Sequence, residues 1–245
     1  MLNLKTLNKV IKIARNISVR YNSSKNKCLT MTQKMILYGD EVAPPVRFAL
    51  MTAFVLGVEF DFRRIDLFAS ENKTELYKKI NPLQKVPALV IGNRSICDSH
   101  VISLYFCRNW DKNNTLYPKD ALTSAKVDEI LFFNSSTLFP IDSEIFTTFF
   151  SSNQIDSKKV NDWLKALDLL ENRLMEHQWL AGDRVMLCDI CAMSTITSVQ
   201  CLIPLADHHV RLKQWLNEIE KLSFTDINKR GLERLNKFID LAKKP

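Results

Sequence analysis

The sequence predicts a small α/β domain followed by an all-helical domain. Two observations support this prediction. Between residues 35 and 110, short apolar runs alternate with helical patterns, whereas beyond about residue 112 only helical patterns occur. A polar, turn-rich stretch at residues 111–118 separates the two regions, as is typical of a linker. We therefore expect domains at residues 31–112 and 119–245, with residues 1–30 outside the fold.

The first domain is expected to follow the order β-α-β-α-β-β-α. Its first strand is the apolar run MILYG, and the next helix starts with two prolines, which a first helical turn tolerates. Asp98 and Ser99 are suited to cap the last helix of this domain. The expected elements are a strand at 35–39, a helix at 44–56, a strand at 58–67, a helix at 73–80, a hairpin at 88–97 turning at Gly92-Asn93, and a helix at 98–110.

The second domain is expected to consist of helices only. Apolar residues at helical spacing give residues 157–177 one buried face. Pro140 predicts a kink in the first long helix, because proline cannot donate to the helical hydrogen-bond ladder. The expected helices span residues 124–150, 157–177, 189–202, 210–222 and 231–242.

The net charge of +7 belongs entirely to the first thirty residues. They contain seven basic residues and no acid, which leaves 27 basic against 27 acidic residues in the rest of the chain. The folded body is therefore neutral, which argues against nucleic-acid binding. Residues 1–30 have the composition of a mitochondrial presequence. They are also consistent with a disordered extension or with an upstream start codon before Met31. We therefore expect a cytoplasmic location, with the mitochondrial matrix as the alternative if residues 1–30 are a presequence.

The six cysteines are scattered through apolar segments, which favours reduced, buried thiols in an intracellular compartment. Cys188 and Cys191 have CxxC spacing, but no second pair of ligands accompanies them, so we expect core residues and no metal. No stretch approaches the ~18–20 apolar residues of a membrane helix, and no integral membrane association is expected.

The order of motifs resembles that of the cytosolic glutathione transferases, in which a thioredoxin-like domain precedes a helical bundle. The resemblance covers roughly residues 35–243. The Pro-Pro-Val-Arg stretch looks like the insect Epsilon class. Within that class, the chain resembles the Noppera-bo group, which works in ecdysteroid production, through YGDE-x-x-PPVR, the helix start CDSHVI, LFFNSSTLFPIDSEIF and GLERL near the end. The motifs are Tyr38 with Pro44-Pro45-Val46-Arg47, Asn81-Pro82 with Val86-Pro87, Asp98-Ser99-His100, and Gly182 with Asp189.

The resemblance implies a glutathione site in the first domain. A carboxylate at Asp98 can pair with the α-amino group of glutathione, and Ser99 with nearby N–H groups can hold its γ-glutamyl carboxylate. The resemblance also implies a cis peptide before Pro87 and places Gln84 near the glycyl carboxylate. The implied glutathione-binding residues are Gln84, Val86, Pro87, Asp98, Ser99 and His100.

One departure from the family concerns catalysis. Delta and Epsilon relatives carry a serine that donates a hydrogen bond to the glutathione sulfur, and Ala43 stands at that position. Losing such a bond removes ~1.5–3 kcal/mol, or roughly one to two pKa units of thiol activation. The catalytic donor is therefore unknown, with Tyr38, the Ala43 N–H and Arg47 as candidates.

A hydrophobic substrate is expected between the two domains, against an aromatic-rich wall. An acid in an apolar stretch needs a partner. The resemblance to the Noppera-bo group assigns Asp142 as the acceptor of a steroid hydroxyl, whereas Glu144 better suits a solvated position. The candidate residues for this site are Phe68, Leu138, Phe139, Asp142 and Phe146.

The leading interpretation is a glutathione transferase that binds glutathione and a steroid-like molecule and acts in ecdysteroid biosynthesis. The alternative is a non-catalytic carrier of sterol or another lipophile on the same fold, which Ala43 favours. A protein-interaction module is a third possibility, which the presence of Asp98 and Ser99 disfavours. The fold also implies a homodimer.

Overall fold

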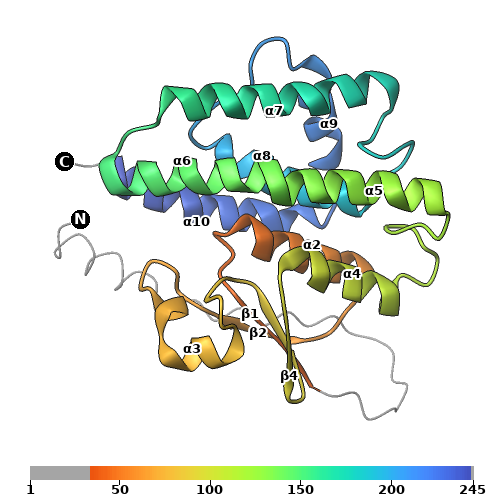
Figure 1. Ribbon diagram of the computed structural model, residues 1–245. Coiled ribbons are helices and arrows are strands. Elements are labelled where there is room, and N and C mark those ends of the chain that lie inside the picture. Colours follow the sequence, from red (N-terminus) through yellow and green to blue (C-terminus); the bar gives the residue numbers. More distant parts are fainter. Residues whose placement is uncertain (1–33, 244–245) are drawn as a thin grey trace. The chain divides into compact units, whose positions relative to one another are not determined.

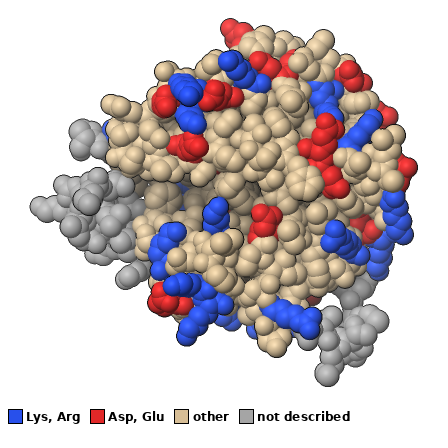
Figure 2. Space-filling view, viewed as in Figure 1, with Lys and Arg blue, Asp and Glu red and all other residues tan. Residues whose placement is uncertain are grey.

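The computed structural model describes residues 34–243, which divide into two compact units at Trp110 and Asp111 (Figure 1). The extension predicted at residues 1–30 lies outside the described residues. In the described part of the chain, no helix is both long and apolar enough to cross a membrane. Basic and acidic side chains are interspersed on the face drawn in Figure 2.

The first unit is built on a four-stranded mixed sheet in the order β2-β1-β3-β4. Strand β1 pairs parallel with β2 and antiparallel with β3, and β3 forms the predicted hairpin with β4. The strands span Met35–Gly39 (β1), Asp61–Arg64 (β2), Ala88–Ile91 (β3) and Arg94–Cys97 (β4).

Helices cover both faces of this sheet. Helices α2 (Pro44–Leu56) and α4 (Ser99–Trp110) pack together, and a side-chain carbon at Gly39 would lie 2.7 Å from the Val46 side chain, so α2 lies close against β1. Helix α3 (Glu75–Ile80) lies on the opposite face, where Tyr77 contacts Tyr38 at 6.5 Å between ring centroids. Neighbouring residues of a strand point to opposite faces, so Tyr38 and Gly39 face different helices.

Two predicted elements of this unit have other bounds in the structure. The strand expected at 58–67 is confined to Asp61–Arg64, because residues 65–69 form a loop closed by hydrogen bonds to Asp66. The helix expected at 73–80 begins at Glu75, since the Thr74 hydroxyl accepts the Tyr77 N–H at 3.2 Å and caps it. A 3-10 turn, Glu71–Lys73, precedes this cap.

The second unit is all-helical, as predicted. At its centre lies α8, every residue of which is buried. The helices span Ala121–Phe133 (α5), Phe139–Ser152 (α6), Ser157–Glu176 (α7), Leu187–Val199 (α8), Val210–Ile219 (α9) and Thr225–Lys243 (α10).

The long helix predicted at 124–150 is interrupted by a π-helical turn, Asn134–Leu138. The turn comes just before Pro140, which cannot donate to the ladder, and buried Asn134 donates to the Thr195 hydroxyl at 2.9 Å. Helix α10 begins six residues before the predicted 231, because Gly231 is a buried interior residue and does not mark a boundary.

The stretch predicted as a linker is an ordered part of the second unit. Asp111 is buried, and its carboxylate accepts the N–H groups of Thr115, Leu116 and Tyr117 at 2.8–2.9 Å. Leu116 also accepts the Leu187 N–H at 2.9 Å, which ties the segment to α8.

Candidate functional site

The loop between β1 and α2, residues 40–43, ends at Ala43, the position at which the sequence resemblance implies a serine. Ala43 is the N-cap of α2 and offers no side-chain hydrogen bond, and the two prolines after it lack N–H groups. The Ala43 N–H, one of the predicted donors to sulfur, already donates to the Asp40 carbonyl at 3.0 Å. The Val46 N–H donates to the Ala43 carbonyl at 3.0 Å. The start of α2 therefore contributes few open donors.

Arg47, the second candidate donor, is wholly buried in the first turn of α2. Its Nη1 donates to the carbonyls of Glu41 and Val42 at 2.9 and 2.7 Å. A guanidinium is a strong, multidentate donor, so these bonds hold the 40–43 loop against the helix. In this position Arg47 shapes the loop that carries Ala43.

Tyr38, the third candidate, lies on the sheet face covered by α3. Its hydroxyl accepts a hydrogen bond from Arg63 of β2 at 3.2 Å, and the Arg63 guanidinium also lies 5.7 Å from the centre of its ring. Gly39 and α2 lie on the other face. The Tyr38 side chain therefore points away from the face that α2 covers.

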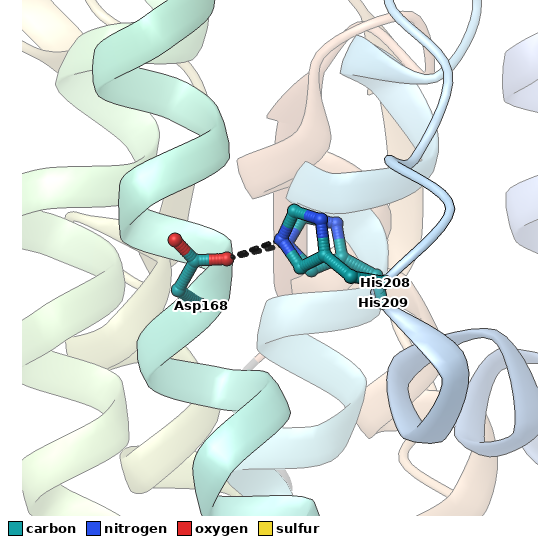
Figure 3. A group of neighbouring side chains, drawn as sticks. All are labelled: Asp168, His208 and His209. Atoms are coloured by element: carbon teal, nitrogen blue, oxygen red, sulfur yellow. Dashed lines mark hydrogen bonds and ion pairs between the residues drawn. The ribbon is translucent and has the colours of Figure 1, made fainter.

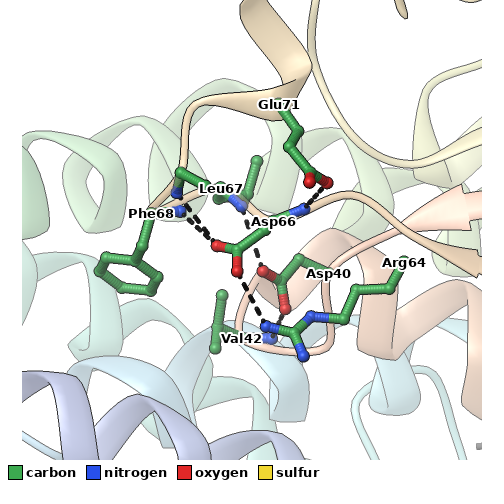
Figure 4. Close-up of polar contacts among 8 residues, drawn as sticks. Asp40, Val42, Arg64, Asp66, Leu67, Phe68 and Glu71 are labelled. Carbon is green, nitrogen blue, oxygen red and sulfur yellow. Dashed lines mark hydrogen bonds and ion pairs between the residues drawn. The ribbon is translucent and has the colours of Figure 1, made fainter. Parts of the chain in front are cut away.

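A buried acid network, which the sequence interpretation missed, lies under the same loop (Figure 4). The Asp40 carboxylate is fully buried and accepts the Leu67 N–H at 3.2 Å and the Val42 N–H at 3.4 Å. Burial raises the pKa of Asp40 from 3.8 to about 7, against the opposing charge of Arg64. An acid directly after an apolar strand was the signal that could have revealed it.

The segment before β3 contains the predicted cis peptide, between Val86 and Pro87. The Lys85 carbonyl just before it accepts bonds from the Tyr77 hydroxyl at 2.9 Å and from the Asn81 amide at 2.6 Å. Gln84 is half-buried, and its carbonyl accepts the Asn72 amide at 2.8 Å. Side chains of the first unit thus hold this segment by its backbone.

Asp98, Ser99 and His100 lie together at the start of α4. Asp98 Oδ1 accepts the N–H groups of His100 and Val101 at 2.8 and 3.3 Å, which confirms the predicted cap. His100 Nδ1 lies 3.3 Å from the same oxygen, and a hydrogen bond from this ring lowers the pKa of Asp98. Ser99 is buried, whereas the Asp98 side chain is 58% exposed.

The candidates for the hydrophobic site are distributed over both units. Phe68 of the first unit is half-buried, and its N–H donates to Asp66 at 3.0 Å. In the second unit, Leu138 and Asp142 are buried around the start of α6, whereas Phe139 is half-buried. Phe146 is half-buried too and stacks on Phe150 with ring centres 6.0 Å apart.

Asp142 and Glu144 occupy different environments on α6. Only 3% of Asp142 is exposed, whereas Glu144 is exposed and forms an ion pair with Lys159 of α7. A buried carboxylate needs polar partners, whereas a solvated one does not. The structure therefore places Asp142 in a buried position and Glu144 in a solvated one, as the sequence suggests.

Asp189 has a structural role at the start of α8. Its carboxylate accepts the N–H groups of Met186 and Leu180 at 2.8 and 3.0 Å and the Trp215 indole N–H at 2.9 Å. The Met186 side chain supplies no reciprocal hydrogen bond, but the Met186 carbonyl accepts the Asp189 N–H at 3.0 Å. Burial raises the pKa of Asp189 to about 6.

A second cluster of titratable residues, Asp168, His208 and His209, joins α7 to the start of α9 (Figure 3). Both His Nε2 atoms approach Asp168 Oδ1, at 2.8 Å for His208 and 2.9 Å for His209. His209 Nδ1 accepts the Ala206 N–H at 3.3 Å, so its Nε2 carries the proton that is shared with Asp168. This proton arrangement favours a structural link over a metal centre.

Comparisons with known proteins identify the family of the chain. Residues 34–108 match the model of the glutathione S-transferase N-terminal domain, and residues 138–223 match that of the C-terminal domain. Among curated relatives, glutathione S-transferase D7 from Anopheles gambiae is 27% identical over 205 residues, which cover 82% of this chain and 94% of that protein.

Solved structures extend the match to nearly the whole described chain. An epsilon-class glutathione S-transferase from the housefly, Musca domestica, has a TM-score of 0.81 and 30% identity, covering 86% of this chain and 99% of its own. A glutathione transferase homologue from Drosophila mojavensis, solved with bound glutathione, has a TM-score of 0.80 and 27% identity. The match covers 84% of this chain and 96% of the homologue. The predicted thioredoxin-like and helical domains are confirmed, and the chain belongs to the glutathione S-transferase family.

Proposed function

We propose that this glutathione transferase binds glutathione through the start of α4, the segment before β3 and the 40–43 loop, and that it also binds a steroid-like molecule. The observation that carries the glutathione assignment is the geometry of Asp98. Its Oδ1 is occupied by the α4 cap, whereas no described residue hydrogen-bonds to its Oδ2. Its lowered pKa keeps the exposed carboxylate charged at neutral pH, ready to pair with the α-amino group of glutathione.

The other glutathione contacts follow from the same arrangement. Ser99 begins α4, where N–H groups and the helix dipole favour a bound carboxylate. Val86 and Pro87 supply backbone for the cysteinyl part, and Gln84 supplies an amide for the glycyl carboxylate. His100 supports the site through Asp98.

Activation of the thiol is proposed to be weaker than in relatives with a serine. The Ala43 side chain has no hydroxyl to donate, and the described contacts of Arg47 and Tyr38 are made to other partners. The helix dipole of α2 still brings about half a unit of positive charge toward the site. Binding of glutathione is therefore expected to be intact, with slow conjugation at neutral pH.

The steroid assignment rests on Asp142. This acid is buried beside Leu138 and Phe139 at the start of α6. A carboxylate in such surroundings can accept a hydroxyl of an otherwise apolar ligand, and Phe146 of the same helix adds aromatic surface. This chemistry fits a hydroxylated steroid and supports membership of the Noppera-bo group and a role in ecdysteroid biosynthesis.

Calorimetry with glutathione and with a hydroxylated steroid such as cholesterol or an ecdysteroid tests the proposal. We expect both to bind, with glutathione in the low-millimolar range or tighter. A protein that binds no glutathione in this range contradicts the glutathione site, and one that binds glutathione but no steroid contradicts the second ligand.

A non-catalytic carrier is the second candidate function, and Ala43 is the observation that favours it. A carrier would bind the lipophile but show no conjugation above the uncatalysed rate. A homodimer and a cytoplasmic location complete the proposal. Sedimentation would test the first. A fluorescent fusion of residues 1–30 would test the second, since import into mitochondria would contradict it.

A further inference from the structure

We propose that Asp40 is a positioning residue that joins the 40–43 loop to the loop at residues 65–69, so that its ionised carboxylate keeps both ligand-facing loops of the first unit in register. This inference deepens the proposed function and rests on it. Ala43 ends the first loop, at the position where the sequence resemblance implies a contact with the glutathione sulfur, and Phe68 in the second loop is a candidate for ligand contact.

The geometry shows how one carboxylate reaches both loops. Asp40 Oδ1 accepts the Val42 N–H at 3.4 Å within the first loop, and Oδ2 accepts the Leu67 N–H at 3.2 Å in the second. Asp40 and Leu67 are 27 positions apart in sequence, so no local turn explains the contact between them. Strand pairing supports it, because the Ile65 N–H donates to the Gly39 carbonyl at 2.8 Å.

The second loop is held by a neighbouring acid. Asp66 Oδ1 accepts the N–H groups of Phe68 and Ala69 at 3.0 and 3.1 Å, and Oδ2 pairs with Arg64 at 3.2 Å. Glu71 accepts the Asp66 N–H at 2.8 Å. The position of Phe68 is thus set by a chain of contacts that reaches Asp40 through Leu67 (Figure 4).

Burial and the neighbouring charged residues together set the pKa of Asp40. Arg64 from β2 favours its ionised form, whereas Asp66 and burial favour the neutral form. Arg47 of α2 donates to the Glu41 and Val42 carbonyls of the same loop. With a pKa of about 7, Asp40 changes its charge in the physiological range. A protonated carboxyl group has one oxygen turned from acceptor to donor, so it cannot accept both N–H groups as well.

A buried acid of this kind costs stability when it ionises. Because its pKa in the folded state lies above 3.8, its contribution to the free energy of unfolding is greatest below pH 3.8 and is lost as pH rises through about 7. A group that destabilises the fold at working pH is a candidate for a functional role. Ordering the two loops around the ligand is the role that its contacts support.

The test uses two ligands whose sulfur carries no proton, S-methylglutathione and S-hexylglutathione. The proteins compared are wild type, Asp40→Asn, and Asp61→Asn as a matched loss of an exposed acid of the same unit. We expect wild type to bind S-methylglutathione roughly threefold to tenfold more weakly at pH 6 than at pH 8. Asp61→Asn should behave like wild type, and Asp40→Asn should bind weakly at both pH values.

The comparison between ligands separates a link to Phe68 from a purely local effect. Asp40→Asn should lose more affinity for S-hexylglutathione than for S-methylglutathione, since the hexyl chain is the part of the ligand that would contact Phe68. An Asp40→Asn protein that keeps the wild-type pH dependence, or loses equal affinity for both ligands, overturns the inference.

A measurement on wild type alone makes the test independent of the variant. If binding favours ionised Asp40, wild type should release a fraction of a proton on binding S-methylglutathione near pH 7, measured by calorimetry in two buffers of different ionisation enthalpy. Zero proton release between pH 6 and 8 overturns the inference. Wild type that binds neither ligand at any pH contradicts the proposed function, and this inference with it.

Discussion

Arg47 Nη1 donates a hydrogen bond of 2.7 Å to the main-chain carbonyl of Val42 from a wholly buried position. The sequence resemblance placed Arg47 among the candidates for holding the thiolate. Its contacts instead stabilise the 40–43 loop, because Arg47 Nη1 also donates to the Glu41 carbonyl. Within the same loop, the Asp40 carboxylate accepts the Val42 N–H. The conformation of the loop that precedes Ala43 thus depends on two buried charged residues.

Replacing Arg47 by lysine should therefore loosen the loop while it keeps the positive charge. Lysine lacks the rigid, planar guanidinium that places Nη1 between the two carbonyls, and we expect the free energy of unfolding to fall by ~1.5–3 kcal/mol. Urea denaturation checks this, with Arg108→Lys, at an exposed site of α4, as the control. Equal stability of the two variants would show that the carbonyl contacts contribute nothing.

Placing a hydroxyl at position 43 should raise conjugation. In Ala43→Ser, a new hydrogen bond to the thiolate is expected to lower the pKa of bound glutathione by roughly one to two units. The pH profile of kcat/KM with 1-chloro-2,4-dinitrobenzene checks this. Ala43→Gly changes the same position without adding a hydroxyl and should leave the profile in place. A shift in both variants would point to backbone effects.

Removing the buried acid of α6 should affect one ligand only. Asp142→Ala is expected to weaken a hydroxylated steroid by ~1.5–3 kcal/mol, because a charge-assisted hydrogen bond is lost, and to leave glutathione affinity unchanged. Calorimetry with each ligand measures this. Glu144→Gln, a change at an exposed acid of the same helix, serves as the control. Equal losses for steroid and glutathione would assign Asp142 to the fold.

The link between α7 and α9 should depend on pH. A hydrogen bond from His208 is the main cause of the lowered pKa of Asp168, and one from His209 adds to it. Since its folded-state pKa lies below 3.8, the stability that Asp168 contributes is present above pH 3.8 and is lost as pH falls through its folded-state pKa.

Asp168→Asn should accordingly be less stable than wild type at pH 7, and the difference should shrink toward pH 3. Thermal unfolding over this range measures it. The exposed Asp240→Asn should show no such trend. A difference between Asp168→Asn and wild type that stays constant with pH would mean that the carboxylate charge is not involved.

Much of the first unit could be predicted from the sequence because its signals are local. The helix at 44–56 and the hairpin at 88–97 have the predicted bounds, since prolines at a helix start and Gly92-Asn93 at a turn act through nearby backbone. The Asp98 cap is also local and was predicted. By contrast, the interruption at Asn134–Leu138 involves a contact with Thr195 of another helix.

The sequence by itself determined the order of the elements and the family, because motifs and their spacing are properties of the chain. Only the tertiary structure decided what surrounds Ala43. The hydrogen bond from Leu67 to Asp40 forms only when β1 pairs with β2. Arg47 becomes buried only when α2 packs against β1. Distant backbone groups become partners only in the folded unit, where removal from water makes each unpaired charge costly.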